Sequence, residues 1–469
     1  MAEKVDQLLE QMKDALRVDG DAVQVVDEAA LRDKIDQLIN QAVFGQGLVR
    51  ETARWLIWEA AQALGIKPAS IHELYMAIGR GDVPTDFTVP AMNVRGINFV
   101  MSRAIFRAAN KMNVGSMLFE IARSEIGYTD QRPAEYVAAV LAAAIKEGFR
   151  GPVFFQGDHF QISASRYKEN AKKEVESLKT LMTEAVEAGF YNIDIDTSTL
   201  VTLEPESLEE QQRLNYEVCA ALTQYARSLE PDGITISLGG EIGEVGGHNS
   251  TVPELDAFMS GYIATLPADV AGISKISVQT GTSHGGVVLP DGTLAEVNVD
   301  FETLGELGRV ARESYGLGGA VQHGASTLPE DAFSKFPEVG TVEIHLATGF
   351  QNMIFDYAPE ALVQASYDYV NEHFAGERKA NQTADQFIYS TRKKAFGSMK
   401  QQWWEMADED RARIGKALQD QFEFLFTQLN VGNTKRYVAA TVDAPTLHRP
   451  RPTEVAEEAD LDIAHDLSD

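Results

Sequence analysis

The sequence is poor in cysteine and in basic side chains, and it contains no long apolar run. A single cysteine, Cys219, excludes a disulfide framework and any metal site built from several cysteines. The 41 Lys and Arg stand against 70 Asp and Glu, a formal net charge of −29. This balance argues against nucleic acids and anionic membranes as partners, because both attract positive surfaces. Without an apolar stretch of about 18 residues or a signal-like N-terminus, we expect a soluble, cytoplasmic protein.

The two ends of the chain differ in pattern from its centre. Apolar residues at helical spacing predict a helical N-terminal extension over residues 1–85, without strands, and a helical C-terminal extension over residues 359–452. Residues 453–469 hold seven acids and no Lys or Arg, and they follow a proline-rich stretch. We expect this tail to be disordered.

The central segment, residues 86–358, alternates short apolar runs with stretches of helical periodicity. Strands that alternate with helices predict βαβ units and a parallel sheet. Eight such units in about 250 residues are typical of an α/β protein with a (β/α)8 TIM barrel, whereas an open doubly wound sheet more often has five to seven strands. The apolar runs are 90–94, 115–122, 151–158, 190–196, 234–243, 273–281, 319–325 and 341–348.

Three histidines lie where predicted barrel strands end, which is the catalytic face of a TIM barrel. They are His159, His284 and His323. Three imidazoles that converge on one rim suit a zinc-type ion with an open coordination position. The alternative is that each is an ordinary hydrogen-bonded rim or core residue. Asp158 precedes His159 and could act as a general base, or it could cap a helix or orient a histidine.

Other strand ends carry groups suited to anions and cations. Backbone N–H groups in the loops that contain Gly285 and Gly324, together with the hydroxyls of Ser326 and Thr348, could bind a phosphate. The alternative is that these glycines serve only tight turns.

Two further carboxylates, Asp196 and Glu241, end the fourth and fifth runs. They could support the metal or offer a second cation position, or they could be plain solvated rim residues. Lys275 lies inside the sixth run, where a barrel enzyme could use a Schiff-base lysine, but no surrounding pattern supports that role.

Six motifs, in order across residues 88–355, resemble the class II, zinc-dependent fructose-bisphosphate and tagatose-bisphosphate aldolases. The resemblance implies one catalytic Zn²⁺ on His159, His284 and His323, Asp158 as the catalytic base, and a second divalent cation near Asp196. It also implies a sugar-phosphate substrate, whose phosphate lies at the glycine loops with Ser326 and Thr348. The motifs are PAMNV (90–94), GDH (157–159), IDTS (195–198), GEIGEVGG (240–247), GTSHG (281–285) and HGAS (323–326).

The first motif adds Asn93 as a substrate-binding candidate, and His345 is another, because it stands where the family has a substrate-contacting Asn.

The resemblance predicts a metal-dependent aldolase that cleaves a ketose phosphate, such as fructose 1,6-bisphosphate, to dihydroxyacetone phosphate and an aldehyde. We also expect a homo-oligomer, because the apolar helical extensions need a partner surface.

Two departures from the family pattern leave other functions open. The loop after Gly247 reads His248-Asn249-Ser250-Thr251, so it lacks the family's proton-transferring acid, and Glu254 is out of register. His345 replaces the family's Asn. Different metal-dependent sugar-phosphate chemistry, as in an epimerase or a monophosphate lyase, and a non-catalytic scaffold subunit are therefore the alternatives.

Overall fold

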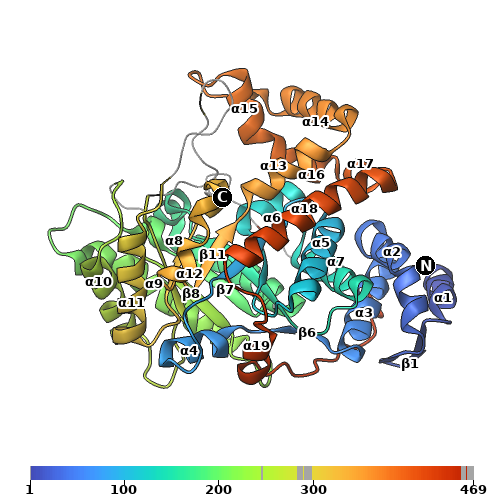
Figure 1. Ribbon diagram of the computed structural model, residues 1–469, viewed down its shortest axis with the longest axis horizontal. Helices are drawn as coiled ribbons and strands as arrows, with labels where there is room; N and C mark the ends of the chain where they lie inside the picture. The colour runs from blue at the N-terminus through green and yellow to red at the C-terminus, as the bar shows by residue number, and fades with distance from the viewer. Residues whose placement is uncertain (1, 244–246, 282–288, 290–297, 456–460, 462–469) are drawn as a thin grey trace.

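A closed barrel of eight parallel strands forms the centre of the molecule, with helices around it (Figure 1). The computed structural model describes residues 2–243, 247–281, 289, 298–455 and 461. From β4 to β11 each strand pairs with the next, and β11 pairs back with β4. These strands are β4 Val89–Asn93, β5 Leu118–Ala122, β6 Gly151–Gln161, β7 Asn192–Asp196, β8 Ser237–Glu241, β9 Lys275–Val278, β10 Ala320–Gln322 and β11 Glu343–Leu346. Each coincides with one apolar run, so the TIM-barrel prediction is confirmed and the open-sheet alternative is wrong.

The barrel strands are joined by helices that pack on the outside. The longer ones are α5 Asn98–Met112, α7 Pro133–Glu147, α8 Ala164–Ala188, α9 Leu208–Ser228, α10 Val252–Thr265 and α11 Phe301–Tyr315. The shorter ones are α6 Arg123–Thr129, α12 Lys335–Glu338, α13 Thr348–Tyr357, η1 Ser198–Leu200, η2 Ala325–Thr327 and η3 Glu330–Ala332. In the described part of the chain, no helix has both the length and the apolar character needed to cross a membrane.

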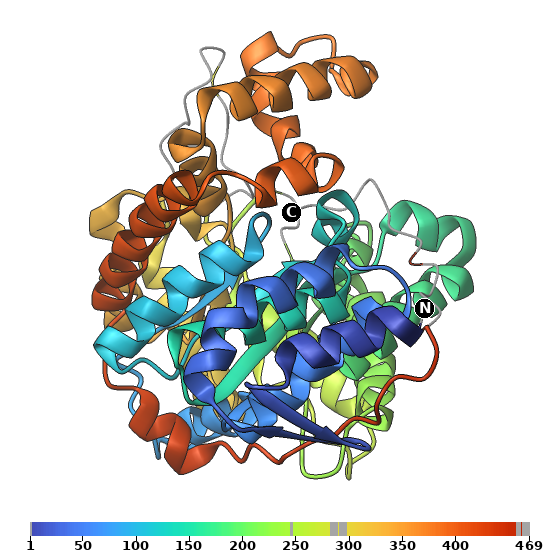
Figure 2. The same cartoon turned by 90° about the vertical axis from the view of Figure 1, so that its right-hand side faces the viewer.

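The segment before β4 covers one side of the barrel (Figure 2). Its elements are α1 Ala2–Met12, β1 Leu16–Asp19, β2 Ala22–Val25, α2 Glu28–Phe44, α3 Leu48–Ala63, β3 Ile66–Ala69 and α4 His72–Arg80. Helix α7 is apolar nearly all round and is buried along almost its whole length, because α2 and α3 pack on the side that faces away from the barrel. These contacts bury apolar surface that the barrel alone would expose.

The expectation that residues 1–85 contain no strand is wrong. Strands β1 and β2 form an antiparallel hairpin that turns at Gly20 with φ +60°. Strand β3 pairs in parallel with the first residues of β6, outside the closed ring. Each of these strands has four residues. Such short strands offer too few alternations to be distinguished from loops by periodicity.

The segment after α13 is helical and projects partly beyond the barrel, at the top of Figure 1. Its elements are α14 Glu360–His373, η4 Ala375–Glu377, α15 Ala384–Thr391, η5 Arg392–Lys394, α16 Ala395–Ser398, α17 Lys400–Trp404, α18 Asp408–Gln428 and α19 Lys435–Thr441. Helix α18 returns to pack on α5. Most of the acidic tail lies outside the described residues.

The chain beyond α19 fastens the N-terminal helices to the barrel. The indole N–H groups of Trp55 and Trp58 donate to the carbonyls of Arg449 and Leu447 at 2.9 and 2.7 Å. The Arg449 guanidinium lies 3.3 Å from the centroid of the Trp58 ring. Residues nearly 400 positions apart in the sequence therefore form one packed layer around α3.

His72, the first residue of α4, should make folding sensitive to acid. Its ring is buried, Nδ1 has no hydrogen-bond partner among the described residues, and burial, with help from Arg227 and Arg80, lowers its pKa to about 4. The unfolded chain binds a proton on this ring near pH 6.5, so stability is lost as the pH falls from about 6.5 towards 4. Urea unfolding at pH 7.5 and at pH 4.5 measures this loss. The free energy of unfolding should fall by about 2–3 kcal/mol less in His72→Gln than in the parent.

The matched control is His373→Gln, which changes an exposed ring on α14. Its loss of stability over the same pH interval should equal that of the parent. If the His72→Gln variant and the control lose the same amount, His72 does not carry the acid sensitivity.

Candidate active site and metal-binding residues

A bulge at the end of β6 turns two consecutive side chains into the barrel. Consecutive residues on a regular strand point to opposite faces. The register between β6 and β7 shifts between Gly157 and Phe160, and His159 has φ +40°. A side chain at position 157 would meet the Phe160 ring at 2.5 Å, so the bulge requires glycine there. The strain of a non-glycine residue at positive φ costs on the order of 1–3 kcal/mol and is typical of functional sites.

The His159 and His323 rings lie together, 4.2 Å apart between centroids, and both are buried. Each has its far nitrogen engaged. His159 Nδ1 lies 3.0 Å from Asp196 Oδ2, and His323 Nε2 lies 2.9 Å from Ser277 Oγ. The near nitrogens, His159 Nε2 and His323 Nδ1, lie 3.9 and 3.8 Å from the same oxygen, Asp158 Oδ1. Metal-binding histidines have this arrangement, in which a second partner fixes the tautomer.

The charges around His159 favour a cation. Although burial opposes its protonation, the carboxylates of Asp158, Asp196 and Glu241 raise its pKa to about 10. Glu241 Oε2 lies 3.5 Å from His159 Nδ1. The same negative potential would stabilise a divalent ion in place of that proton. The ligand atoms of Asp158, His159 and His323 lie within 4.8 Å of one another, and so do those of His159, Asp196 and Glu241. The residues present therefore fit a metal ion.

Two predicted site residues, His284 and Gly285, lie outside the described residues. The third imidazole therefore stays a prediction, and so does the contribution of its loop to phosphate binding.

Asp158 is held as a carboxylate. Burial alone would favour its neutral form, but the imidazoles of His159, His345 and His323 hold its pKa well below the usual range. The amide of Asn93 donates to Asp158 Oδ2 at 2.7 Å and fixes its orientation. An ionised, oriented carboxylate beside a cation site can accept a proton from a bound substrate.

The predicted phosphate residues gather at one edge of the rim. Ser326 lies in η2, directly after Gly324 with φ +68°, and η2 contacts the first turn of α13, where Thr348 begins the helix. Arg95, which sequence reasoning missed, donates to Thr348 Oγ1 at 3.3 Å and forms a buried ion pair with Glu125. A helix N-terminus beside a guanidinium is suited to an anion.

His345, predicted to contact substrate, lies among carboxylates inside the barrel. Its Nδ1 is 3.1 Å from Asp158 Oδ1 and 3.2 Å from Glu120 Oε1, and its Nε2 is 2.7 Å from Glu343 Oε1. Although burial opposes protonation, Glu120 and Asp158 raise its pKa well above the ordinary value. His345 is therefore a buried imidazolium beside the candidate base. The Asn that the family has at this position could not carry such a charge.

Lys275 is part of the same buried network. Its Nζ lies 2.8 Å from Asp194 Oδ1 and forms a second ion pair with Glu343. Although burial opposes the charge, these two carboxylates raise its pKa. A Schiff-base lysine must be neutral and reach the substrate, so this geometry contradicts that role.

Glu254, which is out of register with the family's loop acid, caps a helix. That carboxylate accepts from the Thr251 backbone N–H at 2.8 Å and forms a capping box at the start of α10. His248 is exposed, and its Nε2 lies 3.9 Å from Glu254. In the described part of this loop, Glu254 therefore serves the helix terminus.

The fold and the site together define a TIM-barrel protein with histidines and carboxylates at the end of the barrel where such proteins bind substrates. The sequence model of the family described as fructose-bisphosphate aldolase class-II matches residues 84–406. The chain belongs to this family.

Individual relatives are distant. The D-tagatose-1,6-bisphosphate aldolase subunit GatZ of Escherichia coli (strain K12) is 30% identical over 132 residues, which is 27% of this chain and 30% of that relative. The chain thus matches less than a third of the relative's length.

Solved structures show similarity in fold alone. A probable tagatose 6 phosphate kinase from Sinorhizobium meliloti 1021 is 15% identical, with a TM-score of 0.51, over 76% of this chain and 95% of that one. The fructose-bisphosphate aldolase of Campylobacter jejuni is 17% identical, with a TM-score of 0.47, over 78% and 97%.

Proposed function

We propose that the protein is a metal-dependent aldolase that reversibly cleaves a ketose phosphate to dihydroxyacetone phosphate and an aldehyde. The observation that carries the proposal is the grouping of Asp158, His159 and His323 at the end of the barrel strands, with an ionised carboxylate beside two oriented imidazoles. Family membership supports the same chemistry. A ketose bisphosphate such as fructose 1,6-bisphosphate is the first substrate to test.

The cation, which we propose to be zinc, would be held by His159 and His323 together with His284. When bound, it would supply Lewis-acid polarisation of the substrate carbonyl. A second divalent cation would use Asp196 and Glu241.

The chain's own residues perform the proton transfer. In the condensation direction, the Asp158 carboxylate takes the proton from the carbon of dihydroxyacetone phosphate that will form the new bond. In the cleavage direction, a base takes the proton of the C4 hydroxyl, and the C3–C4 bond breaks to release the aldehyde. The protonated form of Asp158 then gives its proton to the same carbon of dihydroxyacetone phosphate and becomes a carboxylate again. The first turn of α13, Ser326 and Arg95 would hold the phosphate and so fix the reacting carbon against Asp158.

His345 supports a second candidate within the same class of chemistry. A buried imidazolium 3.1 Å from the candidate base gives the site both a proton donor and a proton acceptor. Epimerisation also uses a group that removes a proton and a group that returns one.

Release of dihydroxyacetone phosphate from a panel of ketose mono- and bisphosphates, by zinc-loaded protein, tests the proposal. We expect release that a chelator stops and added zinc restores. Epimerised product without cleavage would favour the second candidate. Neither product, from protein that binds no metal, would contradict both and favour a scaffold.

Metal binding is expected to depend on His323. His323→Ala should lower the affinity for zinc by more than about tenfold, because a direct ligand matters at least as much as the groups that orient it. The measurement is zinc content after gel filtration, with the exposed His373→Ala as control. Equal zinc in both variants would remove His323 from the ligand set.

A further inference from the structure

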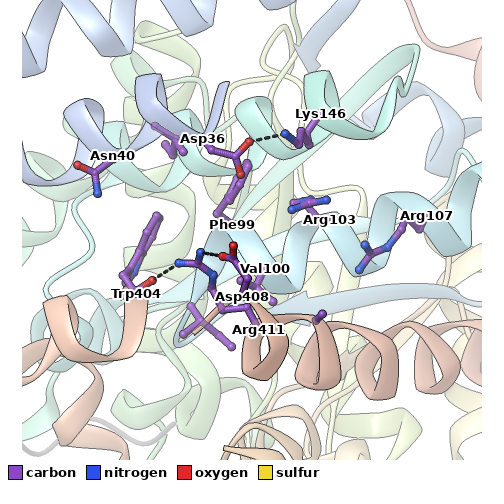
Figure 3. Close-up of a pocket in the computed structure, with 13 residues that line it drawn as sticks. Asp36, Asn40, Phe99, Val100, Arg103, Arg107, Lys146, Trp404, Asp408 and Arg411 are labelled. Atoms are coloured by element: carbon purple, nitrogen blue, oxygen red, sulfur yellow. Dashed lines mark hydrogen bonds and ion pairs between the residues drawn. The ribbon is translucent and has the colours of Figure 1, made fainter. Parts of the chain in front are cut away.

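A cavity of about 460 Å³ lies on the outer side of the barrel and shares no lining residue with the candidate active site (Figure 3). Three parts of the chain enclose it: α2, the start and middle of α5 with the end of α7, and the α17–α18 region. Its volume is within the range of about 300–1,000 Å³ that is usual for small-molecule sites.

Basic side chains dominate the polar part of this cavity. Four cations line it, namely Arg103, Arg107, Lys146 and Arg411, against the two carboxylates of Asp36 and Asp408. Both carboxylates are paired, Asp36 with Lys146 and Asp408 with Arg411. Such a group of cations is unusual in a protein with a net charge of −29 and suggests that the cavity binds an anion.

The two arginines of α5 keep unused donors. Arg103 donates through Nε to Glu147 at 2.6 Å, and among the described residues its two terminal nitrogens have no hydrogen-bond partner. Arg107 lies one helical turn further, where its Nε is buried without a partner in the described part of the chain. Its remaining polar contacts are long, 3.5 Å to the Gly415 carbonyl and 3.8 Å to Glu147.

Such guanidiniums are suited to a phosphate. A charge-assisted hydrogen bond from the terminal nitrogens of a guanidinium to an oxyanion is stronger than a hydrogen bond between neutral groups. Two forks on one helix face can bind a phosphate through paired hydrogen bonds, with Lys146 as a further charge. The two lining carboxylates would repel a long polyphosphate, so a single phosphate monoester fits best.

Two aromatic side chains, Phe99 and Trp404, also line the cavity. Phe99 lies beside Arg103, whose guanidinium carbon is 5.5 Å from the centroid of the Phe99 ring. Arg411 donates to the Trp404 carbonyl at 2.8 Å, which fixes the corner around Trp404. Flat rings bind to aromatic side chains by stacking, which contributes about 1–3 kcal/mol for a nucleobase.

We propose that this cavity binds a nucleoside monophosphate, with its phosphate on Arg103 and Arg107 and its base against Trp404 and Phe99. This proposal is independent of the reaction at the barrel mouth. A ligand in this cavity would contact both terminal segments of the chain, which lie on either side of α5.

Calorimetric titration of the full-length protein, in the presence of a chelator, tests the proposal. The probes are AMP, GMP, CMP and UMP, with adenosine and inorganic phosphate as partial ligands. We expect one mononucleotide per chain to bind at least about tenfold more tightly than adenosine or phosphate, since it alone uses both parts of the cavity. No saturable binding of any of the four in the millimolar range would overturn the proposal.

Three variants locate the binding. Arg103→Met should weaken mononucleotide binding by about tenfold or more, because one charge-assisted fork is lost. Trp404→Leu should bring the affinity for the mononucleotide down to that for inorganic phosphate. Lys111→Met, on the same helix but outside the cavity, should change nothing, and thermal unfolding checks that all three are folded.

Two results would contradict this location. Unchanged affinity in folded Arg103→Met would place the mononucleotide elsewhere, for instance at the candidate active site. Equal affinity of the parent for phosphate and mononucleotide would show an anion site without recognition of the base.

Discussion

Replacing Asp158 with asparagine is expected to lower kcat by about 10²–10⁴-fold while the divalent cation stays bound. Asparagine has nearly the same shape and can still face Asn93, which donates to Asp158 Oδ2 at 2.7 Å. It cannot accept the proton that the reaction moves. Because the imidazoles of His159, His345 and His323 hold the pKa of Asp158 well below its usual range, the parent carries a carboxylate at this position near pH 7.

The measurement is turnover with a saturating ketose phosphate, together with metal content. Asp27→Asn makes the same chemical change at the N-cap of α2, where the carboxylate accepts from the Ala30 N–H at 3.0 Å. Asparagine is an equally good cap, so this control should keep full activity. Turnover of Asp158→Asn within a few-fold of the control would show that another group is the base.

The exchange of substrate protons separates the base from other roles of Asp158. With dihydroxyacetone phosphate alone in deuterated water, the parent should exchange a proton on the carbon next to the carbonyl for deuterium from the solvent. Asp158→Asn should lose this exchange together with turnover. Loss of turnover with intact exchange would instead indicate that Asp158 positions the aldehyde.

The sequence predicts the barrel well because parallel barrel strands are apolar and regularly spaced. All eight apolar runs are strands, and the positional rule for TIM barrels led directly to Asp158, His159 and His323. The N-terminal hairpin was missed because its four-residue strands have no recognisable period. Sequence position alone could not show that β6 bulges, although Gly157 marks the place where only glycine fits.

The buried polar groups were harder to predict because their roles depend on partners far along the chain. Glu120 and Glu343 interrupt apolar runs, which signals a side chain that points into the barrel. Only the fold shows that both meet His345. The cavity beside α5 was missed for the same reason, since it brings Asp36, Arg103 and Arg411 together from three distant segments.

This buried network makes Lys275 a strong determinant of stability. Its ammonium is one of two cations, with His345, among the carboxylates of Asp194, Glu343 and Glu120. Burial raises the pKa of Glu120 to about 8, although the His345 imidazolium lowers it. Glu343 differs, because Lys275 and His345 overcome burial and lower its pKa to about 2. The negative charge of Glu343 therefore depends on its direct contacts with Lys275 and His345.

Replacing Lys275 with methionine should destabilise the protein by about 3–5 kcal/mol, because it leaves Glu343 and Asp194 buried without their common partner. Urea unfolding at neutral pH measures this cost.

Lys111→Met removes a largely exposed ion pair with Glu423 and should cost about 0–1 kcal/mol. Adding Glu343→Gln to Lys275→Met should recover part of the loss, since the amide keeps the volume and carries no charge. If Lys275→Met costs no more than the Lys111 control, or if Glu343→Gln only adds to the damage, the ion pairs do not stabilise this end of the barrel.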